Sequence, residues 1–427
     1  MRTSFQICIL SLVALFIGVA APTVNAQCTG DVIPSGIIDG VDLAQILSSW
    51  GPCTSCPADI DGDGLVTGND LGQLLAGWGP CAPFIASVAP GQGTIVGGTP
   101  ITISGAYFTG VTSVTIGGAP VINMVVVSST TITAVTPAHA AGSVSITITT
   151  PSRTSTFQNA FSYFAVAVPS WATLLEAVPD PAVVTDATLR AAIEESGFAW
   201  RIRDTTSNIE MVLVPAGTFT MGCIAGDQEC YVDESPPHQV TLTNAFYLGK
   251  TEVTQAQWQA TMGSNPSYFV PANGFSSDTT KPVEQVSWNM IQGFNTATGF
   301  RLPTEAEWEF ACRAGTTSSR YGELNDIAWY YRNWTNYGTQ PVAGKLPNAL
   351  GLYDTLGNVW EWCQDWYGPY SSGSVTNPTG STTGSARLLR GGSWSSDVAN
   401  YCRASMRNAY GPVVINVSVG FRVARNP

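Results

Sequence analysis

Two stretches of the chain repeat each other, and this duplication restricts the fold of the N-terminal part more than any other feature. GIIDGVDLAQILSSWGPC begins at Gly36 and GLVTGNDLGQLLAGWGPC at Gly64, an offset of 28 residues (64 − 36). A repeated sequence indicates a repeated structural unit, and each copy has an apolar pattern typical of a helix. We therefore expect residues 27–82 to form two copies of one small helical unit.

The second copy contains an acidic loop, DIDGDGLVTGND, directly before its helix pattern. Calcium binds about six to eight oxygens, and carboxylates at alternate loop positions supply them. The predicted ligands, at loop positions 1, 3, 5, 7 and 12, are Asp59, Asp61, Asp63, the carbonyl of Leu65, and Asp70. The alternative is a solvated acidic turn. The first copy has Ile33 and Ser35 in place of two of these carboxylates.

The acidic loop and the following pattern LGQLLAGW resemble a dockerin repeat, which is half an EF-hand. The resemblance covers roughly residues 28–81. It implies a small α-helical pair that docks onto a cohesin-like partner, and therefore attachment to a cell surface or scaffold.

The N-terminus has the pattern of a secretory signal. Arg2 precedes the apolar run ICILSLVALFIGVAA, and the small-residue stretch PTVNA ends at Ala26. An uncleaved membrane anchor is the alternative, but the run is shorter than the roughly 20 apolar residues that a spanning helix needs. We expect residues 1–26 to be removed, which leaves a secreted or cell-surface protein without a membrane span.

Composition excludes two further classes. The net charge is −12 and charged residues make up 11% of the chain, so binding to a nucleic-acid backbone is disfavoured. His139 and His238 are the only histidines, which argues against a histidine-based metal or proton-transfer centre.

Residues 83–164 are almost free of charge and rich in Val, Ile and Thr. TPITISG, SVTIGG, TITAV and SVSITITT alternate apolar and small polar residues, which predicts half-buried strands of an antiparallel sandwich. The region resembles the IPT/TIG immunoglobulin-like domain, so an all-β spacer or adhesion module is expected. A linker is predicted at 165–208, with a short helix that Thr185 or Asp186 caps.

The C-terminal region contains a series of aromatic-rich motifs. In order, they are IEMVLVPAGTFTMG, FYLGKTEVTQAQWQATMG, PVEQVSWNMI, RLPTEAEWEFACRAGT, GLYDTLGNVWEWCQDWYG, RLLRGGSW and VGFRVARNP. Their order and spacing resemble the formylglycine-generating enzyme family, also called sulfatase-modifying factors, over residues 209–427. The resemblance implies a C-type-lectin-like α+β domain with little regular structure, which makes the whole chain a multidomain protein.

The motif LPTEAEWEF predicts a helix over 305–313, since Thr304 and Glu307 form a capping box. Glu305 and Glu309 share one face of this helix and could in principle act as an acid/base pair. We favour the alternative of a solvated or internally bonded helix start.

The family resemblance also implies a structural calcium site in GLYDTLGNVWEW. Its ligands map onto Asp354, two backbone carbonyls and a glutamate, that is, Asp354, Gly357, Val359 and Glu361. An all-oxygen set suits calcium. The family's other calcium site is poorly matched, because Trp329 stands about where an asparagine ligand would fall.

Active members of the family use two cysteines shortly after GGS[WY] to hold copper and oxidise a substrate cysteine to formylglycine. In this chain the first position falls on Ser396, and the second falls near Tyr401, among residues 399–401. None of these residues is a cysteine. Two thiolates suit cuprous copper, and the other side chains here are poor replacements.

Nine cysteines remain after the signal, and in an exported chain they are disulfide candidates. The family resemblance implies a bridge between Cys312 and Cys402, whereas Asn295 and Val423 replace the family's other bridge. Short spacing suggests a further pair, and repeat symmetry suggests two more, although four cysteines allow three connectivities. These pairs are Cys223 with Cys230, Cys28 with Cys53, and Cys56 with Cys81. Cys363 is left over, as a buried thiol rather than a nucleophile.

Two functions follow from these patterns. The first is an exported, calcium-stabilised binding module for a peptide or glycan, with a ligand cleft formed by Trp360, Ser393, Trp394 and Ser396. The second is a copper-dependent, formylglycine-generating oxidoreductase. We favour the binding module, because the chain lacks the thiol pair that the enzyme requires.

Overall fold

The structure is a computed structural model that describes residues 28–334, 336–396 and 399–427. The predicted signal at 1–26 lies outside these residues. Within them, no helix has both the length and the apolar character needed to cross a bilayer.

The chain forms two compact units. The first extends to Ser162, and the second comprises Tyr163–Pro427 together with the short segment Gly93–Gly98.

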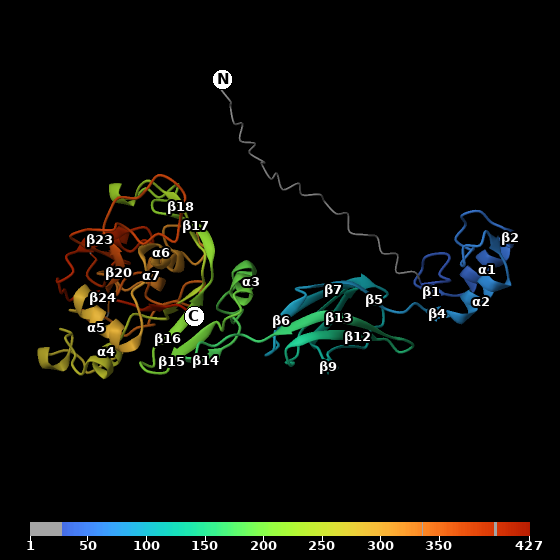
Figure 1. Ribbon diagram of the computed structural model, residues 1–427, viewed down its shortest axis with the longest axis horizontal. Helices are drawn as coiled ribbons and strands as arrows, with labels where there is room; N and C mark the ends of the chain where they lie inside the picture. The colour runs from blue at the N-terminus through green and yellow to red at the C-terminus, as the bar shows by residue number, and fades with distance from the viewer. Residues whose placement is uncertain (1–27, 335, 397–398) are drawn as a thin grey trace, which may run out of the picture. The chain divides into compact units, whose positions relative to one another are not determined.

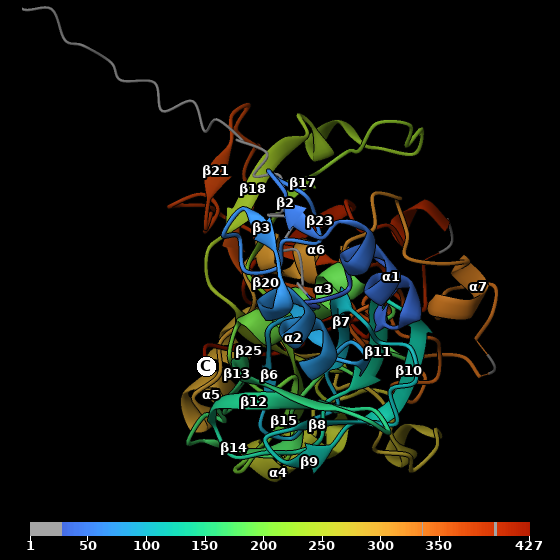
Figure 2. The same cartoon turned by 90° about the vertical axis from the view of Figure 1, so that its right-hand side faces the viewer.

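The repeat region at the start of the first unit consists of two helices and four two-residue strands. They are β1 (Ile37–Ile38), α1 (Gly40–Ser48), β2 (Gly51–Pro52), β3 (Leu65–Val66), α2 (Gly68–Ala76) and β4 (Gly79–Pro80). Each helix begins with a capping box, Asp39 with Asp42 in the first copy and Thr67 with Asp70 in the second. Figure 2 shows α1 and α2 side by side.

The two copies exchange strands. β1 of the first copy pairs with β4 at the end of the second, and β2 pairs with β3. The beginning of one copy therefore lies beside the end of the other. A small apolar core fills the space between them, made of Val32, Ile38, Ile46, Ala58, Val66 and Leu74.

This exchange overturns the predicted disulfides of the repeat region. The structure joins Cys28 to Cys81 and Cys53 to Cys56, with Cα–Cα distances of 5.5 and 5.9 Å. The predicted pairs, Cys28 with Cys53 and Cys56 with Cys81, assumed that each copy closes on itself. The bridges instead connect the copies, because the strands do.

Residues 84–164 form an antiparallel sandwich, visible as two layers of arrows in Figure 1. One sheet has the strand order β10-β11-β7-β5 and the other β6-β13-β12-β8-β9. The strands are β5 (Phe84–Ala89), β6 (Gln92–Thr94), β7 (Pro100–Ala106), β8 (Ser113–Ile116), β9 (Ala119–Pro120), β10 (Ile122–Ser128), β11 (Thr131–Val135), β12 (Gly142–Thr149) and β13 (Thr154–Phe164). The four strands predicted from alternating residues are confirmed as β7, β8, β11 and β12.

The linker predicted for residues 165–208 is wrong. β14 (Ala172–Glu176) pairs with β15 (Arg201–Asp204), which continues the sheet of the second unit. Trp200 and Ile202 are buried in the core of that unit. The predicted helix is confirmed as α3 (Ala187–Glu195), with Asp186 as its N-cap. The segment is therefore part of the C-terminal domain.

The rest of the second unit combines many short elements around one large core. The strands are β16 (Glu210–Val214), β17 (Gly217–Met221), β18 (His238–Leu242), β19 (Phe246–Gly249), β20 (Trp360–Trp366), β21 (Val375–Thr376), β22 (Arg387–Arg390), β23 (Arg407–Tyr410), β24 (Val419–Gly420) and β25 (Ala424–Arg425). The helices are α4 (Gln255–Met262), α5 (Trp288–Thr298), α6 (Glu305–Arg313) and α7 (Leu324–Ile327), with short 3-10 turns at Val232–Glu234, Pro271–Asn273 and Ala399–Tyr401.

Three sheets carry this domain, with the orders β14-β15-β16-β19-β25, β17-β18-β21 and β23-β22-β20-β24. Helix α6 has the predicted bounds and the predicted capping box. The core contains large aromatic side chains, such as Trp258 and Trp362, as well as fully buried arginines. Long loops connect the elements, which agrees with the predicted α+β domain of little regular structure.

Candidate functional site

The acidic loop of the second repeat brings three of its predicted ligands together. Carboxylate oxygens of Asp59, Asp61 and Asp63 all lie within 4.8 Å of one another. Partial desolvation, together with repulsion from the neighbouring carboxylates, raises the pKa of Asp61 above its ordinary value. The loop therefore concentrates negative charge at one point, as a hard cation requires.

The fourth carboxylate of this loop serves the backbone. Asp70 accepts hydrogen bonds from the backbone N–H groups of Ile60 and Thr67, both at 2.8 Å. It thus ties the start of α2 to the loop. No contact of the Leu65 carbonyl identifies it as a ligand, and its predicted role stays a prediction.

The first repeat has the same loop backbone without the same charges. Asp31 accepts from Gly36 N–H at 2.8 Å, as Asp59 accepts from Gly64 N–H at 2.9 Å. Asp31 lies near Cys28 and Cys81, but their sulfurs are joined in a disulfide and offer no thiolate. The loop geometry is duplicated, whereas the acidic cluster is confined to the second copy.

The second acidic site, in GLYDTLGNVWEW, is buried. Asp354 Oδ2 accepts from Ala343 N–H at 2.6 Å, while its Oδ1 is buried without a hydrogen-bond partner. Burial and the nearby Glu361 outweigh the backbone hydrogen bond and raise the pKa of Asp354 to about 6. Gly357 has a φ of +86°, and a Cβ there would lie 2.4 Å from the carbonyl oxygen of Trp329. Only glycine fits this turn.

Glu361 is committed to a side chain of the protein. Both of its oxygens contact Arg422, each at 2.6 Å, and Oε2 also accepts from Trp308 Nε1 at 2.7 Å. Of the four predicted ligands, Asp354 thus offers a free carboxylate oxygen, whereas Glu361 already has its counter-charge. The assignment of Asp354, Gly357, Val359 and Glu361 as a calcium site stays a prediction.

Glu252 is a third buried carboxylate at this site, which the sequence analysis missed. Its Oε1 accepts from Val359 N–H at 3.3 Å and its Oε2 from Asn358 Nδ2 at 3.1 Å. Burial and the charges of Asp354 and Glu361 raise its pKa well above the ordinary value. Three carboxylates thus face one guanidinium, and the unpartnered oxygen of Asp354 fits a bound cation. In the sequence, Glu252 lies in the motif KTEVTQ. No local pattern there indicates that its carboxylate is buried.

The carboxylates on one face of α6 are structural, as the favoured alternative predicted. Glu305 accepts from Arg407 at 2.7 and 3.0 Å and from Tyr370 Oη at 3.0 Å. Glu309 accepts from Arg313 Nε at 2.9 Å and also contacts Arg390. Each carboxylate is buried and paired with arginine, so both act within the core of the domain.

The segment that follows β22 holds the two positions where the family has reactive thiols. Gly392 has a φ of +78°, and a Cβ there would lie 2.9 Å from the sulfur of Cys402, so only glycine allows this bend. The bend turns the following residues inward. Ser396 is buried, and its hydroxyl accepts from Ser393 N–H at 2.9 Å. Tyr401 lies in a 3-10 turn and stacks against Tyr231.

The predicted cleft is closed. Trp360, Ser393, Trp394 and Ser396 are all buried. The inward bend at Gly392 places Trp394 under neighbouring loops, where its indole N–H donates to the Val417 carbonyl at 3.2 Å. These four residues therefore support the surface and do not line an open groove.

The predicted bridge between Cys312 and Cys402 is also wrong. Both thiols belong to one buried cluster, but neither is in a disulfide, and Cys363 is free as well. Burial raises the pKa of the Cys312 and Cys402 thiols to about 12. The bridge between Cys223 and Cys230 is confirmed.

A row of aromatic rings lies over the segment that contains Trp394. Ring centroids are 4.9 Å apart between Trp394 and Tyr337, 5.7 Å between Tyr337 and Trp334, and 6.4 Å between Trp334 and Tyr331. Tyr331 and Tyr337 are 56% and 59% exposed. We call Tyr331, Trp334, Tyr337 and Trp394 the aromatic row. It extends from the buried ring of Trp394 to the exposed rings of Tyr337 and Tyr331.

The fold and this site define an α+β, C-type-lectin-like domain that follows an immunoglobulin-like sandwich. Residues 198–427 match the sulfatase-modifying factor enzyme 1-like domain, and residues 83–163 match the IPT/TIG domain. The first match covers more than half of the chain, which therefore belongs to the sulfatase-modifying factor family. Both resemblances are confirmed, whereas the dockerin resemblance stays a prediction.

Relatives carry different names. A formylglycine-generating enzyme of Streptomyces coelicolor is 31% identical over 300 residues, which cover 55% of this chain and 94% of that enzyme. The serine/threonine-protein kinase pkn1 of Chlamydia pneumoniae is 34% identical over 243 residues, which cover 51% of this chain and 38% of the kinase. Among solved structures, Treponema denticola variable protein 1 is 33% identical, with a TM-score of 0.46, over 51% of this chain and 95% of that one.

Proposed function

We propose that the C-terminal domain binds a ligand and does not carry out the thiol chemistry of formylglycine-generating enzymes. The observation that carries this proposal is the buried serine at the first thiol position, Ser396, whose hydroxyl is held by Ser393 N–H. Cuprous copper selects soft thiolates, and a hydroxyl does not replace one. The residues present do not fit the family's two-thiolate copper site.

The nearest thiol does not restore the missing pair. A thiol with a pKa of about 12, as at Cys402, is protonated at neutral pH. The thiolate is the form that attacks substrates and binds metals, so a buried, protonated thiol does neither well. Cys312 and Cys363 are equally buried.

The aromatic row supports a binding role. Tyrosine and tryptophan present a large apolar face and one polar group, and they are enriched where proteins bind other molecules. The exposed ring of Tyr337 packs against the buried ring of Trp394, and the exposed ring of Tyr331 packs against Trp334. A peptide or a glycan is the ligand class we propose for this surface.

Calcium is the cofactor we propose, as a structural ion. The acidic cluster of Asp59, Asp61 and Asp63 supports one site, and the unpartnered oxygen of Asp354 supports the other. Bound calcium would neutralise these carboxylates and so stabilise the loops that carry them.

We also propose export and surface attachment. The support is the N-terminal signal pattern and the dockerin-like repeat in residues 27–82, which implies a cohesin-like partner. The disulfides between the two copies agree with an oxidising compartment.

Two measurements separate binding from catalysis. First, the protein is loaded with copper, incubated in air with a sulfatase-type cysteine peptide, and analysed by mass spectrometry. We expect the peptide to stay unmodified while an active formylglycine-generating enzyme converts it. Appreciable conversion would contradict the proposal and favour a copper-dependent oxidoreductase.

Second, peptide and glycan arrays are probed with the wild-type protein, with Tyr337→Ala, and with Tyr367→Ala as a control on a different loop. Loss of an exposed anchoring ring should weaken binding about tenfold, because such rings dominate binding energy. The control should bind like the wild type. Equal binding by all three proteins would remove the aromatic row from the proposal.

A further inference from the structure

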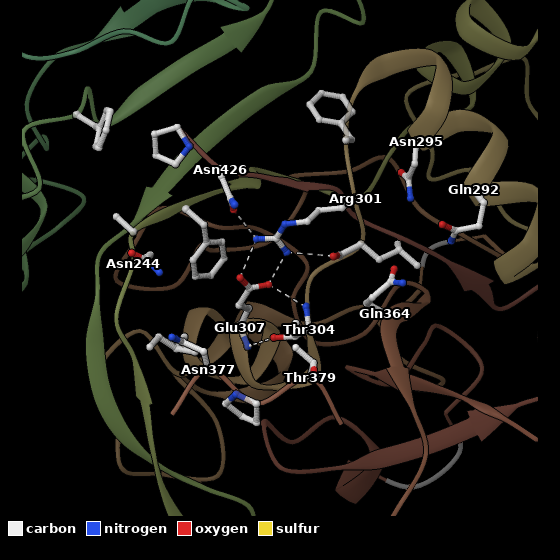
Figure 3. A pocket seen from close by; sticks show the side chains of 18 of the residues that line it. Asn244, Gln292, Asn295, Arg301, Thr304, Glu307, Gln364, Asn377, Thr379 and Asn426 are labelled. Carbon is white, nitrogen blue, oxygen red and sulfur yellow. Dashed lines mark hydrogen bonds and ion pairs between the residues drawn. The ribbon is translucent and has the colours of Figure 1, made fainter. Parts of the chain in front are cut away.

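A hollow in the C-terminal domain shares no residue with the aromatic row or the acidic sites. It is a pocket of about 1060 Å³ between the start of β19, helix α5, the entry to α6 and the loop at 377–379 (Figure 3). This volume lies at the upper end of the range for pockets that bind small molecules.

The charged side chains that line this pocket pair with each other. Among its described lining residues, Arg301 and Glu307 are the only charged side chains, and they form a two-pronged ion pair at 2.6 and 2.8 Å. Arg301 also donates to Asn426 Oδ1 at 2.9 Å. Because the guanidinium is already occupied, a phosphate or carboxylate gains little here.

Carboxamides provide most of the other polar groups. They come from five separate segments and surround the hollow in Figure 3: Asn244, Gln292, Asn295, Gln364, Asn377 and Asn426. A carboxamide both donates and accepts hydrogen bonds, as does each hydroxyl of a sugar. Groups arranged around a hollow suit a ring with hydroxyls on its rim, whereas an extended peptide pairs with the edge of a strand.

Asn295 is the residue of this pocket that points most directly to a ligand. Its side chain points into the hollow from α5, one turn beyond Gln292 (Figure 3). It is 7% exposed, and neither Oδ1 nor Nδ2 has a hydrogen-bond partner. Buried polar groups in folded proteins are normally paired, since leaving them unpaired costs free energy. An entering hydroxyl would satisfy both atoms.

Aromatic walls complete the pocket. Phe198, Phe246 and Phe300 line it together with the carboxamides. An aromatic ring packs against the apolar C–H face of a sugar while the amides bind its hydroxyls.

We propose that this pocket binds a neutral oligosaccharide. The carboxamides, each of which offers a donor and an acceptor, would bind the sugar hydroxyls, with Asn295 as a specificity-determining residue. The phenylalanines would pack against the apolar face of the sugar. The site is independent of the ligand proposed for the aromatic row, so either can fail without the other.

Isothermal titration of the full chain with cellotetraose, xylotetraose, maltotetraose and mannotetraose tests the proposal, at up to about 10 mM to include weak binding. At least one sugar should bind saturably. Asn295→Leu should weaken that binding at least about tenfold, because two hydrogen bonds are lost, without lowering the melting temperature. A purely structural role would lower the melting temperature instead. Gln364→Ala is a second pocket variant, and Tyr337→Ala should leave this binding unchanged.

Three outcomes would overturn the proposal. The first is no saturable binding of any of the four sugars. The second is unchanged affinity in both Asn295→Leu and Gln364→Ala. The third is a pocket-dependent preference for tetragalacturonate or for a short alanine peptide, which would assign the site to an anion or to a peptide.

Discussion

The repeat region and the C-terminal domain both contain few long elements, yet they are held together differently. The repeats have a core of six apolar residues, and two disulfides join the copies. The C-terminal domain has a large core and buries Arg390, Arg403 and Arg422 completely, each paired with a carboxylate. A core too small to stabilise a fold is cross-linked, whereas a large core can bury ion pairs.

The buried ion pairs give the largest expected effect. Arg422→Met should lower the free energy of unfolding by about 3–5 kcal/mol, because it leaves Glu361 buried without its counter-charge. Urea denaturation measures this loss. Arg203→Met is the matched control: Arg203 is 43% exposed and pairs with Glu210 at the surface, so its loss should cost less than about 1 kcal/mol. Similar losses in both variants would refute the contrast.

The disulfides of the repeat region can be compared with each other. The Cys28–Cys81 bridge closes a separation of 53 residues, and Cys53–Cys56 closes only 3. Chain entropy predicts a loss of about 4 kcal/mol for Cys28→Ser/Cys81→Ser and about 2 kcal/mol for Cys53→Ser/Cys56→Ser. Thermal unfolding of the first unit, followed by circular dichroism, should rank the two variants in this order. The reverse ranking would contradict the strand exchange as the reason for the bridges.

A buried carboxylate without an arginine partner should make the stability of the protein depend on pH in the opposite direction to a carboxylate that is paired with arginine. Burial raises the pKa of Glu284 from 4.5 to about 7, against a weaker effect of the backbone N–H groups that it accepts from. Between these values the folded protein holds a proton that the unfolded chain has released, so stability falls as pH rises through this window. Glu284→Gln should therefore be more stable than wild type by about 3 kcal/mol at pH 8 and equally stable at pH 4.

Glu234 provides the paired counterpart. Burial opposes its ionisation, but Arg403, at 2.6 and 2.8 Å, lowers its pKa below the ordinary value. Its stabilisation is present above the unfolded pKa and is lost as the pH falls, so Glu234→Gln should destabilise the protein at pH 8. Denaturation curves for both variants across this pH range test the contrast. If the two variants change in stability in the same direction, pairing with arginine does not determine the sign of the pH dependence.

The smallest expected effect concerns the acidic loop. Asp61→Asn should weaken calcium binding about tenfold, because it removes one of three clustered carboxylates. Ile33→Ala, at the equivalent position of the first copy, should leave binding unchanged. Calorimetric titration with calcium measures both. If the wild-type protein binds no calcium at this loop, the calcium site proposed for the first unit is wrong.

Features that the chain encodes locally were predictable. The caps of α3 and α6 are read from residues that are adjacent in sequence, and the strands of the sandwich from their alternation. Family motifs placed the thiol positions on residues that are not cysteines.

Pairings between distant segments were not predictable. Because strands pair between the two repeats, the disulfides join different cysteines from those predicted. Because β14 pairs with β15, the predicted linker is part of a sheet. Glu361 meets Arg422 only because β20 and β24 lie side by side. The amides of the pocket beside α5 come from five segments, and no local pattern signals their convergence.

The exchanged strands have a consequence for how this protein can change over generations. Deleting either copy would remove one partner from each strand pair and one cysteine from each bridge that links the copies. A single surviving copy would keep its helix and its acidic loop but would have nothing to close against. The duplication can therefore be inherited, transplanted or lost only as a whole, even though its two loops are free to diverge.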